Sequence, residues 1–326
     1  MPAKAFVKAI NDNYYIYFAS EYEATHPDVV HDAATAWKRI ADVLKSKLTN
    51  MQEYTIVDIG SGTGFVASRL LEECLPFKNY IGFEPSSDMR NAATQRLKDR
   101  RLYFKLFDIS KDDMFFPELK AIEGKKIITL NSVLHHIVWW EDFLTVIKNT
   151  LNTGDLLILC HEPNSRFCGN ETLVRFFDSI QEEKMRRNLR AFYLNPMNYI
   201  QKIRRLMRMG GYTAPSKYDL INKELKVSGV IKKDLLPALI SAIIDYGVPL
   251  CWRGINIEKE YDEGFYCIES LMEDYFKDME ILLSFTYQHL AFSPVVLSPK
   301  WRLKEKALEE EYPMYGAQFC LVIQKS

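Results

Sequence analysis

Residues 55–65 read Thr-Ile-Val-Asp-Ile-Gly-Ser-Gly-Thr-Gly-Phe, and this stretch decides the fold class of the chain. The apolar run before Gly60 predicts a buried strand, and the residues from Phe65 onward predict a helix. Gly60, Gly62 and Gly64 allow positive φ angles and a close approach of the backbone to a ligand. The amide groups at the start of the following helix would face the same crevice. The stretch therefore predicts a strand, a ligand-binding turn and a helix.

A glycine-rich turn of this kind has a second interpretation, the dinucleotide-binding pattern Gly-x-Gly-x-x-Gly. In that pattern a third glycine lets the helix pack tightly on the strand, but Phe65 occupies the corresponding position here. Asp58 also precedes Gly60 by two residues, where its carboxylate can receive a ligand ammonium group rather than a phosphate. A nicotinamide or flavin enzyme is therefore disfavoured. A glycine turn that binds no ligand is the remaining alternative.

The segment from Asp58 to Gly64 resembles the S-adenosylmethionine loop of class I methyltransferases. The resemblance implies an α/β fold: a Rossmann-like seven-stranded, mostly parallel sheet in a three-layer αβα arrangement with a helical lid insertion. It also implies that S-adenosyl-L-methionine is the cofactor. The loop residues expected to bind it are Asp58, Gly60, Ser61, Gly62, Gly64 and Phe65.

Composition restricts the function further. A chain of 326 residues, 48% of them hydrophobic, can bury a large core. The 6 cysteines form no Cys-x-x-Cys pair, so neither a disulfide framework nor a metal site is expected. We find no signal peptide and no apolar run of bilayer length, and we expect a cytoplasmic protein without a membrane partner. The formal net charge of −1 argues against DNA and disfavours RNA as partners.

Runs rich in strand-forming residues alternate with helical patterns after the glycine turn, which is typical of a doubly wound parallel sheet. Helices are expected over residues 65–73, 86–98 and 140–151. The expected strands are 54–59, 80–84, 102–107, 126–131 and 156–160, followed far downstream by 279–287 and 317–323.

The segment between the fifth and sixth expected strands is too long for an ordinary connection. Its pattern is largely helical, over residues 171–190, 197–209, 218–225 and 232–246. We interpret it as an insertion that caps the carboxyl ends of the strands, where open α/β sheets bind ligands. The expected organisation is an N-terminal helical cap (1–50), a cofactor-binding core (51–165), a helical substrate cap (166–278) and the last two strands of the core (279–326).

The ends of the other strands carry matching chemistry. Glu84 ends the second strand, where a carboxylate can accept hydrogen bonds from both ribose hydroxyls of a nucleoside. By resemblance, Asp108 and Ile109 would meet the adenine amino group and ring, and Pro85 and Met89 would flank the adenine. The alternatives are a solvated strand end for Glu84, a helix cap or loop carboxylate for Asp108, and helix core for Met89. Asn131 after the fourth strand, and Tyr15 and Tyr22 in the aromatic N-terminal segment, complete the expected cofactor site.

Candidate catalytic residues follow the fourth and fifth strands. The stretch Asn131 to Ile137 contains His135 and His136 and resembles small-molecule methyltransferases in which a histidine faces the acceptor. A histidine has a pKa near neutrality and is suited to take the acceptor proton. His136 is the first candidate for this base, followed by His135 and Glu162. The alternative for the histidines is a purely structural role, and the alternative for Glu162 is a solvated loop carboxylate.

Residues 184–217 contain many Lys and Arg and no Asp or Glu. They can be the solvated face of an amphipathic lid, or they can bind an anionic acceptor or RNA. The sequence thus predicts methyl transfer to an O, N or C atom of a small molecule in biosynthesis or secondary metabolism. An RNA-modifying methyltransferase and a non-catalytic cofactor-binding protein are the alternatives. The sequence identifies neither the acceptor nor the oligomeric state.

Overall fold

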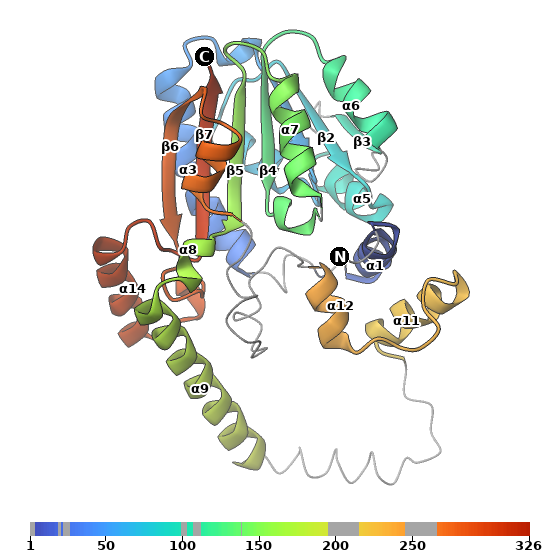
Figure 1. The fold of residues 1–326 in the computed structure, drawn as a ribbon, viewed down its shortest axis with the longest axis vertical. Helices are drawn as coiled ribbons and strands as arrows, with labels where there is room; N and C mark the ends of the chain where they lie inside the picture. The colour runs from blue at the N-terminus through green and yellow to red at the C-terminus, as the bar shows by residue number, and fades with distance from the viewer. Residues whose placement is uncertain are drawn as a thin grey trace.

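The computed structural model describes residues 4–18, 21, 27–98, 103–106, 112–137, 139–194, 215–244 and 266–326. A 7-stranded sheet with the order β3-β2-β1-β4-β5-β7-β6 forms its centre (Figure 1). Strands β1 to β5 pair in parallel, and β7 runs antiparallel to both of its neighbours. The strands are β1 (Thr55–Ile59), β2 (Asn79–Glu84), β3 (Tyr103–Leu106), β4 (Lys126–Asn131), β5 (Leu156–Pro163), β6 (Met279–Tyr287) and β7 (Gln318–Lys325).

Helices connect and flank these strands. Ser86 caps the helix after β2, because its Oγ accepts a hydrogen bond from the Met89 amide at 3.3 Å. The helices are α1 (Lys4–Phe18), α3 (Pro27–Lys47), α4 (Phe65–Glu72), α5 (Ser87–Arg96), α6 (Asp112–Lys120), α7 (Trp140–Thr150), α8 (Ser165–Cys168), α9 (Glu171–Leu194), α11 (Lys217–Val227), α12 (Pro237–Ile244), α13 (Ile268–Asp274) and α14 (Pro299–Glu311), with the 3₁₀ turn η3 (Leu134–His136).

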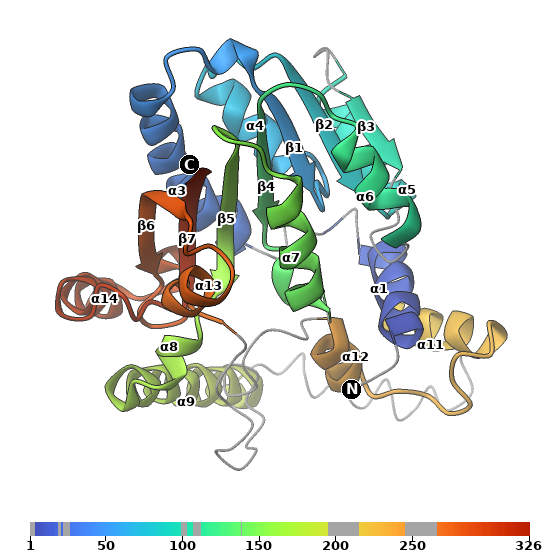
Figure 2. The same ribbon diagram turned by 45° about the horizontal axis from the view of Figure 1, so that its top comes forward.

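The sheet has helices on both faces (Figure 2). Side chains alternate along a strand, so Val57 and Ile59 of β1 pack on one face and Ile56 on the other. The first face is covered by α6, α7 and α13, and the second by α3 and α4. Burial on both faces explains why β1 reads as an almost continuous apolar run. The observed architecture is the expected α/β class with a mixed sheet.

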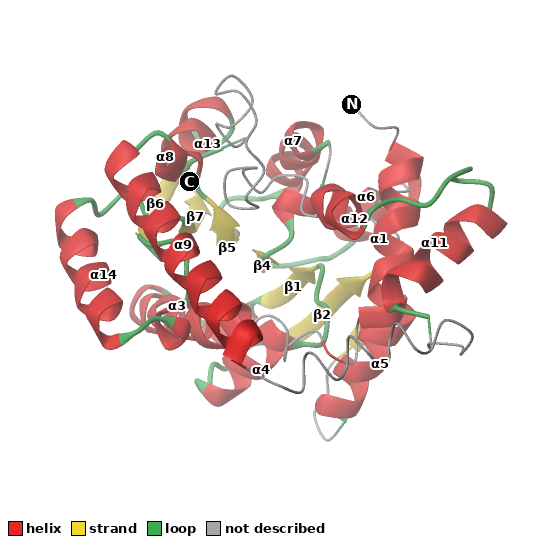
Figure 3. Ribbon diagram, turned by 90° about the horizontal axis from the view of Figure 1, so that it is seen from below, coloured by secondary structure: helices red, strands yellow, loops and turns green. Residues whose placement is uncertain are grey.

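Three helices pack together at the carboxyl ends of the parallel strands. Val7 and Ile10 of α1 form an apolar cluster with Ile221 and Leu225 of α11 and with residues of α12. Figure 3, viewed from below, shows α1, α11 and α12 side by side next to β1, β2 and β4. The N-terminal helix and part of the predicted insertion therefore meet over the edge where ligands are expected.

The element boundaries show one informative difference from the sequence prediction. The fifth strand was expected to end at residue 160, but β5 continues to Pro163. A β-bulge lies between Cys160 and Glu162, and His161 has a φ of 58°. Because β7 pairs with Glu162 and Pro163 beyond the bulge, this polar segment is strand rather than loop.

Several other predictions have a plain outcome. Helices α6, α13 and α14 were not expected, and the helix expected over 197–209 lies outside the described residues. Within the described ranges, every helix is too short or too polar to cross a bilayer.

A buried ion pair joins β4 to the start of β5. Lys126 Nζ lies 3.0 Å from Asp155 Oδ2, and both side chains are at most 2% exposed. The Asp155 carboxylate also accepts hydrogen bonds from the amides of Lys126 and Asn152, both at 2.8 Å. The adjacent pair, Lys125 and Glu53, is 3.1 Å apart but about half exposed.

We predict that Asp155→Ala lowers the free energy of unfolding by about 3–5 kcal/mol, since it leaves a buried ammonium without its partner. The matched control Glu53→Ala should cost less than about 1 kcal/mol, because the exposed pair is hydrated and screened. Urea denaturation of the three proteins measures both values. Equal losses in the two variants would contradict the importance of the buried pair.

Candidate cofactor and acceptor site

The glycine turn after β1 is held against β2. The amides of Gly60 and Ser61 donate to the Phe83 carbonyl at 2.8 and 3.0 Å. Gly60, Gly62 and Gly64 have φ angles of 67°, 53° and 80°, a backbone conformation that residues other than glycine rarely adopt. The turn therefore needs glycine for its backbone conformation, as the sequence indicated.

The glycines also differ in their surroundings. A Cβ on Gly60 would lie 2.5 Å from Val133 Cγ2, and one on Gly64 would lie 2.7 Å from Leu97 Cδ1. A Cβ on Gly62 would meet only the Gly60 carbonyl, at 3.9 Å. Gly60 and Gly64 are thus required for packing, whereas Gly62 faces open space.

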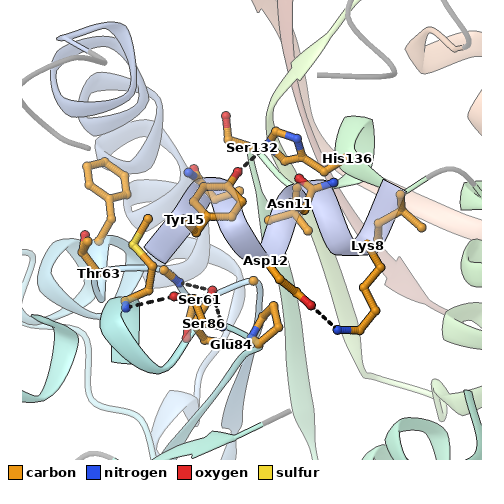
Figure 4. A pocket seen from close by; sticks show the side chains of 18 of the residues that line it. Lys8, Asn11, Asp12, Tyr15, Ser61, Thr63, Glu84, Ser86, Ser132 and His136 are labelled. Carbon is orange, nitrogen blue, oxygen red and sulfur yellow. Dashed lines mark hydrogen bonds and ion pairs between the residues drawn. The ribbon is translucent and has the colours of Figure 1, made fainter. Parts of the chain in front are cut away.

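That space is a pocket of about 1160 Å³, including its open mouth. Figure 4 shows it between the glycine turn, the end of β2, the turn after β4 and helix α1. Of the predicted cofactor residues, those that line it are Gly60, Ser61, Gly62, Phe65, Glu84, Pro85, Met89, Asn131 and Tyr15. Asp108, Ile109 and Tyr22 lie outside the described residues.

Glu84 lies at the floor of the pocket with its side chain almost fully buried. Its Oε2 accepts from the Gly62 amide at 2.9 Å, and its Oε1 accepts from the Ser86 amide at 2.8 Å. Burial raises the pKa of Glu84 to about 7, although these amides act in the opposite direction. A strong acceptor that titrates near neutrality therefore lies beside the glycine turn.

We predict that binding of a nucleoside ligand by its ribose hydroxyls strengthens with pH between 6 and 8, because the ionised Glu84 is the better acceptor. With a pKa near 7 in the free protein, the gain is up to roughly tenfold. Titration calorimetry with S-adenosylhomocysteine at both pH values measures it. Glu84→Gln should abolish the pH dependence and weaken binding by about 1.5–3 kcal/mol. An unchanged pH slope in the variant would assign the effect to another group.

Asp58 differs from its sequence prediction. Its side chain does not line the pocket, and it is 1% exposed. The carboxylate accepts from the Tyr80 hydroxyl and from Thr129 Oγ1, the latter at 2.7 Å. Burial raises its pKa to about 7 against these two hydrogen bonds. Because strand alternation points this carboxylate into the α4 face of the sheet, it is not available to a ligand ammonium group.

His136 lines the pocket, as predicted, and contacts two other elements. Its Nδ1 lies 2.6 Å from the Ile244 carbonyl at the end of α12. Its Nε2 lies 3.4 Å from the Tyr15 hydroxyl of α1. A carbonyl oxygen only accepts, so Nδ1 carries the proton in the neutral ring and Nε2 is left as the acceptor.

His135 and Glu162 do not line the pocket, which corrects their prediction as catalytic candidates. Glu162 is fully buried and accepts from the amides of Val133, Leu134 and His135 at 2.7, 2.9 and 3.2 Å. It also contacts His135 Nδ1 at 2.9 Å and accepts from the Tyr266 hydroxyl at 3.2 Å. Burial acts to raise the pKa of Glu162, but His135 and the amides lower it overall. The bulge at His161 places this carboxylate under η3 rather than at the rim of the pocket.

We predict that Glu162→Ala lowers the free energy of unfolding by at least about 3 kcal/mol, because it leaves three buried amides without their acceptor. The control is Glu72→Ala, whose carboxylate pairs with Arg69 on the surface and should cost less than about 1 kcal/mol. Thermal and urea denaturation measure both. A loss below about 1 kcal/mol in the Glu162 variant would show that the turn does not depend on this carboxylate.

Helix α1 supplies pocket residues that the sequence analysis missed. We expected only its aromatic residues to approach the ligand, but a whole face of the helix lines the pocket. The spacing of polar residues one turn apart in residues 7–15 is the signal that could have identified them. The α1 residues in question are Val7, Lys8, Asn11 and Asp12 beside Tyr15, and Ser132 and Trp139 join them from the core.

Comparison with known proteins agrees with this geometry. Residues 57–157 match the sequence profile of a family described as a methyltransferase domain. The chain contains a methyltransferase domain. As a class I domain of this kind, it takes S-adenosylmethionine as its cofactor. No curated protein is similar to the chain by sequence.

Several solved structures match the chain at low sequence identity. A carbon methyltransferase named CurJ is 22% identical, with 40% of this chain and 35% of that chain covered and a TM-score of 0.35. An amino pentose methyltransferase from Micromonospora echinaspora, solved with bound cofactor, is 18% identical over 42% of this chain and 54% of its own, with a TM-score of 0.31. A methyltransferase from Anabaena variabilis is 15% identical over 98% of this chain and 95% of its own, with a TM-score of 0.44. The chain thus spans less than two thirds of the first two of these structures.

The pocket residues fit S-adenosylmethionine. Ser61 Oγ is buried without a hydrogen-bond partner, and Gly62 leaves the space that a Cβ would fill. Glu84 would accept from the ribose hydroxyls, while Pro85 and Met89 would contact the base. Two acidic residues line the pocket, Glu84 and Asp12, and Asp12 forms an ion pair with Lys8 on the same helix.

Proposed function

We propose that this chain transfers a methyl group from S-adenosylmethionine to an oxygen, nitrogen or carbon atom of a small molecule, with His136 as the group that accepts the acceptor proton. One observation carries the proposal: His136 Nε2 faces the same pocket as the glycine turn, and the Ile244 carbonyl keeps the proton on Nδ1. In the neutral ring, Nε2 is then the nitrogen that can accept a proton.

Methyl transfer requires alignment of the acceptor atom with the methyl group and removal of the acceptor proton. When bound, S-adenosylmethionine supplies an already activated methyl group. The glycine turn and Glu84 would fix the adenosine end, and η3 would fix His136 relative to it. The Tyr15 hydroxyl lies 3.4 Å from Nε2. A hydroxyl or amine of the methyl acceptor would replace it as the donor to the ring. No step of this proposal requires a metal ion.

The cap over the strand ends belongs to the same proposal. His136 contacts both Tyr15 of α1 and Ile244 of α12. We assign α1, α11 and α12 as the cover that closes the acceptor space, with the insertion over 166–278 as the substrate cap. Three described cations of the basic stretch contact other side chains, since Lys184 lies over the Phe292 ring, Arg186 pairs with Glu182 and Lys217 pairs with Glu21.

The experiment is transfer of a labelled methyl group from S-adenosylmethionine into a cell extract that is separated into small-molecule, protein and RNA fractions. We expect label in the small-molecule fraction. Label in RNA instead would favour the RNA-modifying alternative, and no label in any fraction would favour a non-catalytic cofactor-binding protein.

We predict that His136→Asn lowers turnover of the labelled acceptor by about 10²–10⁴-fold, the usual contribution of a general base. Asparagine keeps a donor for the Ile244 carbonyl but has no basic nitrogen. Affinity for S-adenosylhomocysteine, measured by calorimetry, should stay within about twofold. Turnover reduced less than about threefold would make His136 a structural residue, and a parallel loss of affinity would place it in the cofactor site.

A further inference from the structure

Asn11 of α1 has a polar atom that the protein itself does not satisfy. Its Nδ2 donates to the Val7 carbonyl at 3.0 Å. Its Oδ1 is buried and has no hydrogen-bond partner. A buried acceptor that lacks a donor costs free energy, which a ligand can recover by supplying one. Asn11 lines the pocket, so the missing donor is expected from that side.

The orientation of the Asn11 amide follows from chemistry. A carbonyl oxygen only accepts, so the NH₂ group must face Val7 and the oxygen must face the other way. Residues four apart share one face of a helix, which places Tyr15 one turn beyond Asn11 on the pocket side. Figure 4 shows both side chains along α1, with Asn11 on the side of His136.

The pocket therefore presents two hydrogen-bond acceptors, Asn11 Oδ1 and His136 Nε2, and the latter lies 3.4 Å from the Tyr15 hydroxyl. Among the described residues that line the pocket, Lys8 is the only Lys or Arg, and it forms an ion pair with Asp12 on the same helix. The ion pair with Asp12 partly neutralises the Lys8 ammonium, which weakens its attraction for a carboxylate or phosphate. The remaining wall includes Val7, Val133, Ile137 and Trp139, whose side chains favour a mostly apolar ligand.

We propose that Asn11 determines acceptor specificity by accepting a hydrogen bond from a hydroxyl or amino group on a largely apolar small molecule. The inference rests on the proposed function, since it assumes that the acceptor enters this pocket beside His136. It narrows the acceptor to molecules with a hydrogen-bond donor and disfavours those whose polar group at this position is a carboxylate. Such selection is efficient because a molecule without the donor leaves Asn11 Oδ1 buried and unpaired.

The test uses three probes of one shape: 2-naphthol, its methyl ether and 2-naphthoate. Their binding to the protein saturated with S-adenosylhomocysteine is measured by ligand-observed NMR. We expect the naphthol to bind about three- to tenfold more tightly than either of the others. Asn11→Leu should remove this difference, and Asn11→Asp, which keeps the acceptor, should preserve the preference for the naphthol over the ether.

Asn13→Leu is the matched control. Asn13 makes the same kind of contact within α1, its Nδ2 donating to the Ala9 carbonyl at 2.8 Å, but it does not line the pocket. It should leave the preference unchanged. Equal binding of the three probes to the unmodified protein, including no binding by any of them, would overturn the proposal, as would a preference that survives Asn11→Leu.

Two outcomes separate this inference from the proposed function. If Asn11→Leu weakens S-adenosylhomocysteine binding by more than about threefold, Asn11 contacts the cofactor and the inference is wrong while methyl transfer stands. If the naphthol preference is present but no methyl transfer occurs to any small molecule, the pocket recognises donors and the proposed function fails.

Discussion

The carboxylate of Glu162 is the contact on which the ligand-binding edge of this sheet depends. It accepts hydrogen bonds from three successive amides of the turn after β4 and contacts the His135 ring and the Tyr266 hydroxyl. Three segments of the chain are thereby joined at one buried charge: the bulged end of β5, the turn η3 and Tyr266, two residues before α13. A buried carboxylate is stable only when it is fully paired, so these segments must be correctly placed together.

The position of His136 follows from that arrangement. The Glu162 carboxylate fixes the backbone of η3, and His136 ends this turn with its ring directed to the pocket. Ser132 and His161, with φ angles of 59° and 58°, mark where the chain departs from regular strand geometry on either side. The strain of two such residues is offset by the buried hydrogen bonds that the departures allow. A proton acceptor held this way needs little reorganisation when a substrate arrives.

The pocket has two walls of different origin. The glycine turn, β2 and η3 provide the wall that suits the cofactor, and their backbone amides and carbonyls are held by the sheet. Helix α1 provides the other wall and is attached mainly by apolar contacts with α11 and α12. Under our proposal, the first wall holds the cofactor, and α1 with the insertion selects the acceptor.

The glycine-turn side of the pocket could be predicted from the sequence. The glycine turn, the strands on either side of it and Glu84 are local features, because positive φ angles, apolar runs and a carboxylate at a strand end are read directly from neighbouring residues. The other features depend on how segments distant in the chain pack together. Asp58 and Glu162 looked like ligand-binding carboxylates in the sequence, but both are buried. Strand alternation directs Asp58 to the interior, and the bulge in the pairing of β5 with β7 does the same for Glu162. No pattern in the sequence indicated Asn11, because its place at the pocket depends on the packing of α1 against α11 and α12, which are distant in the chain.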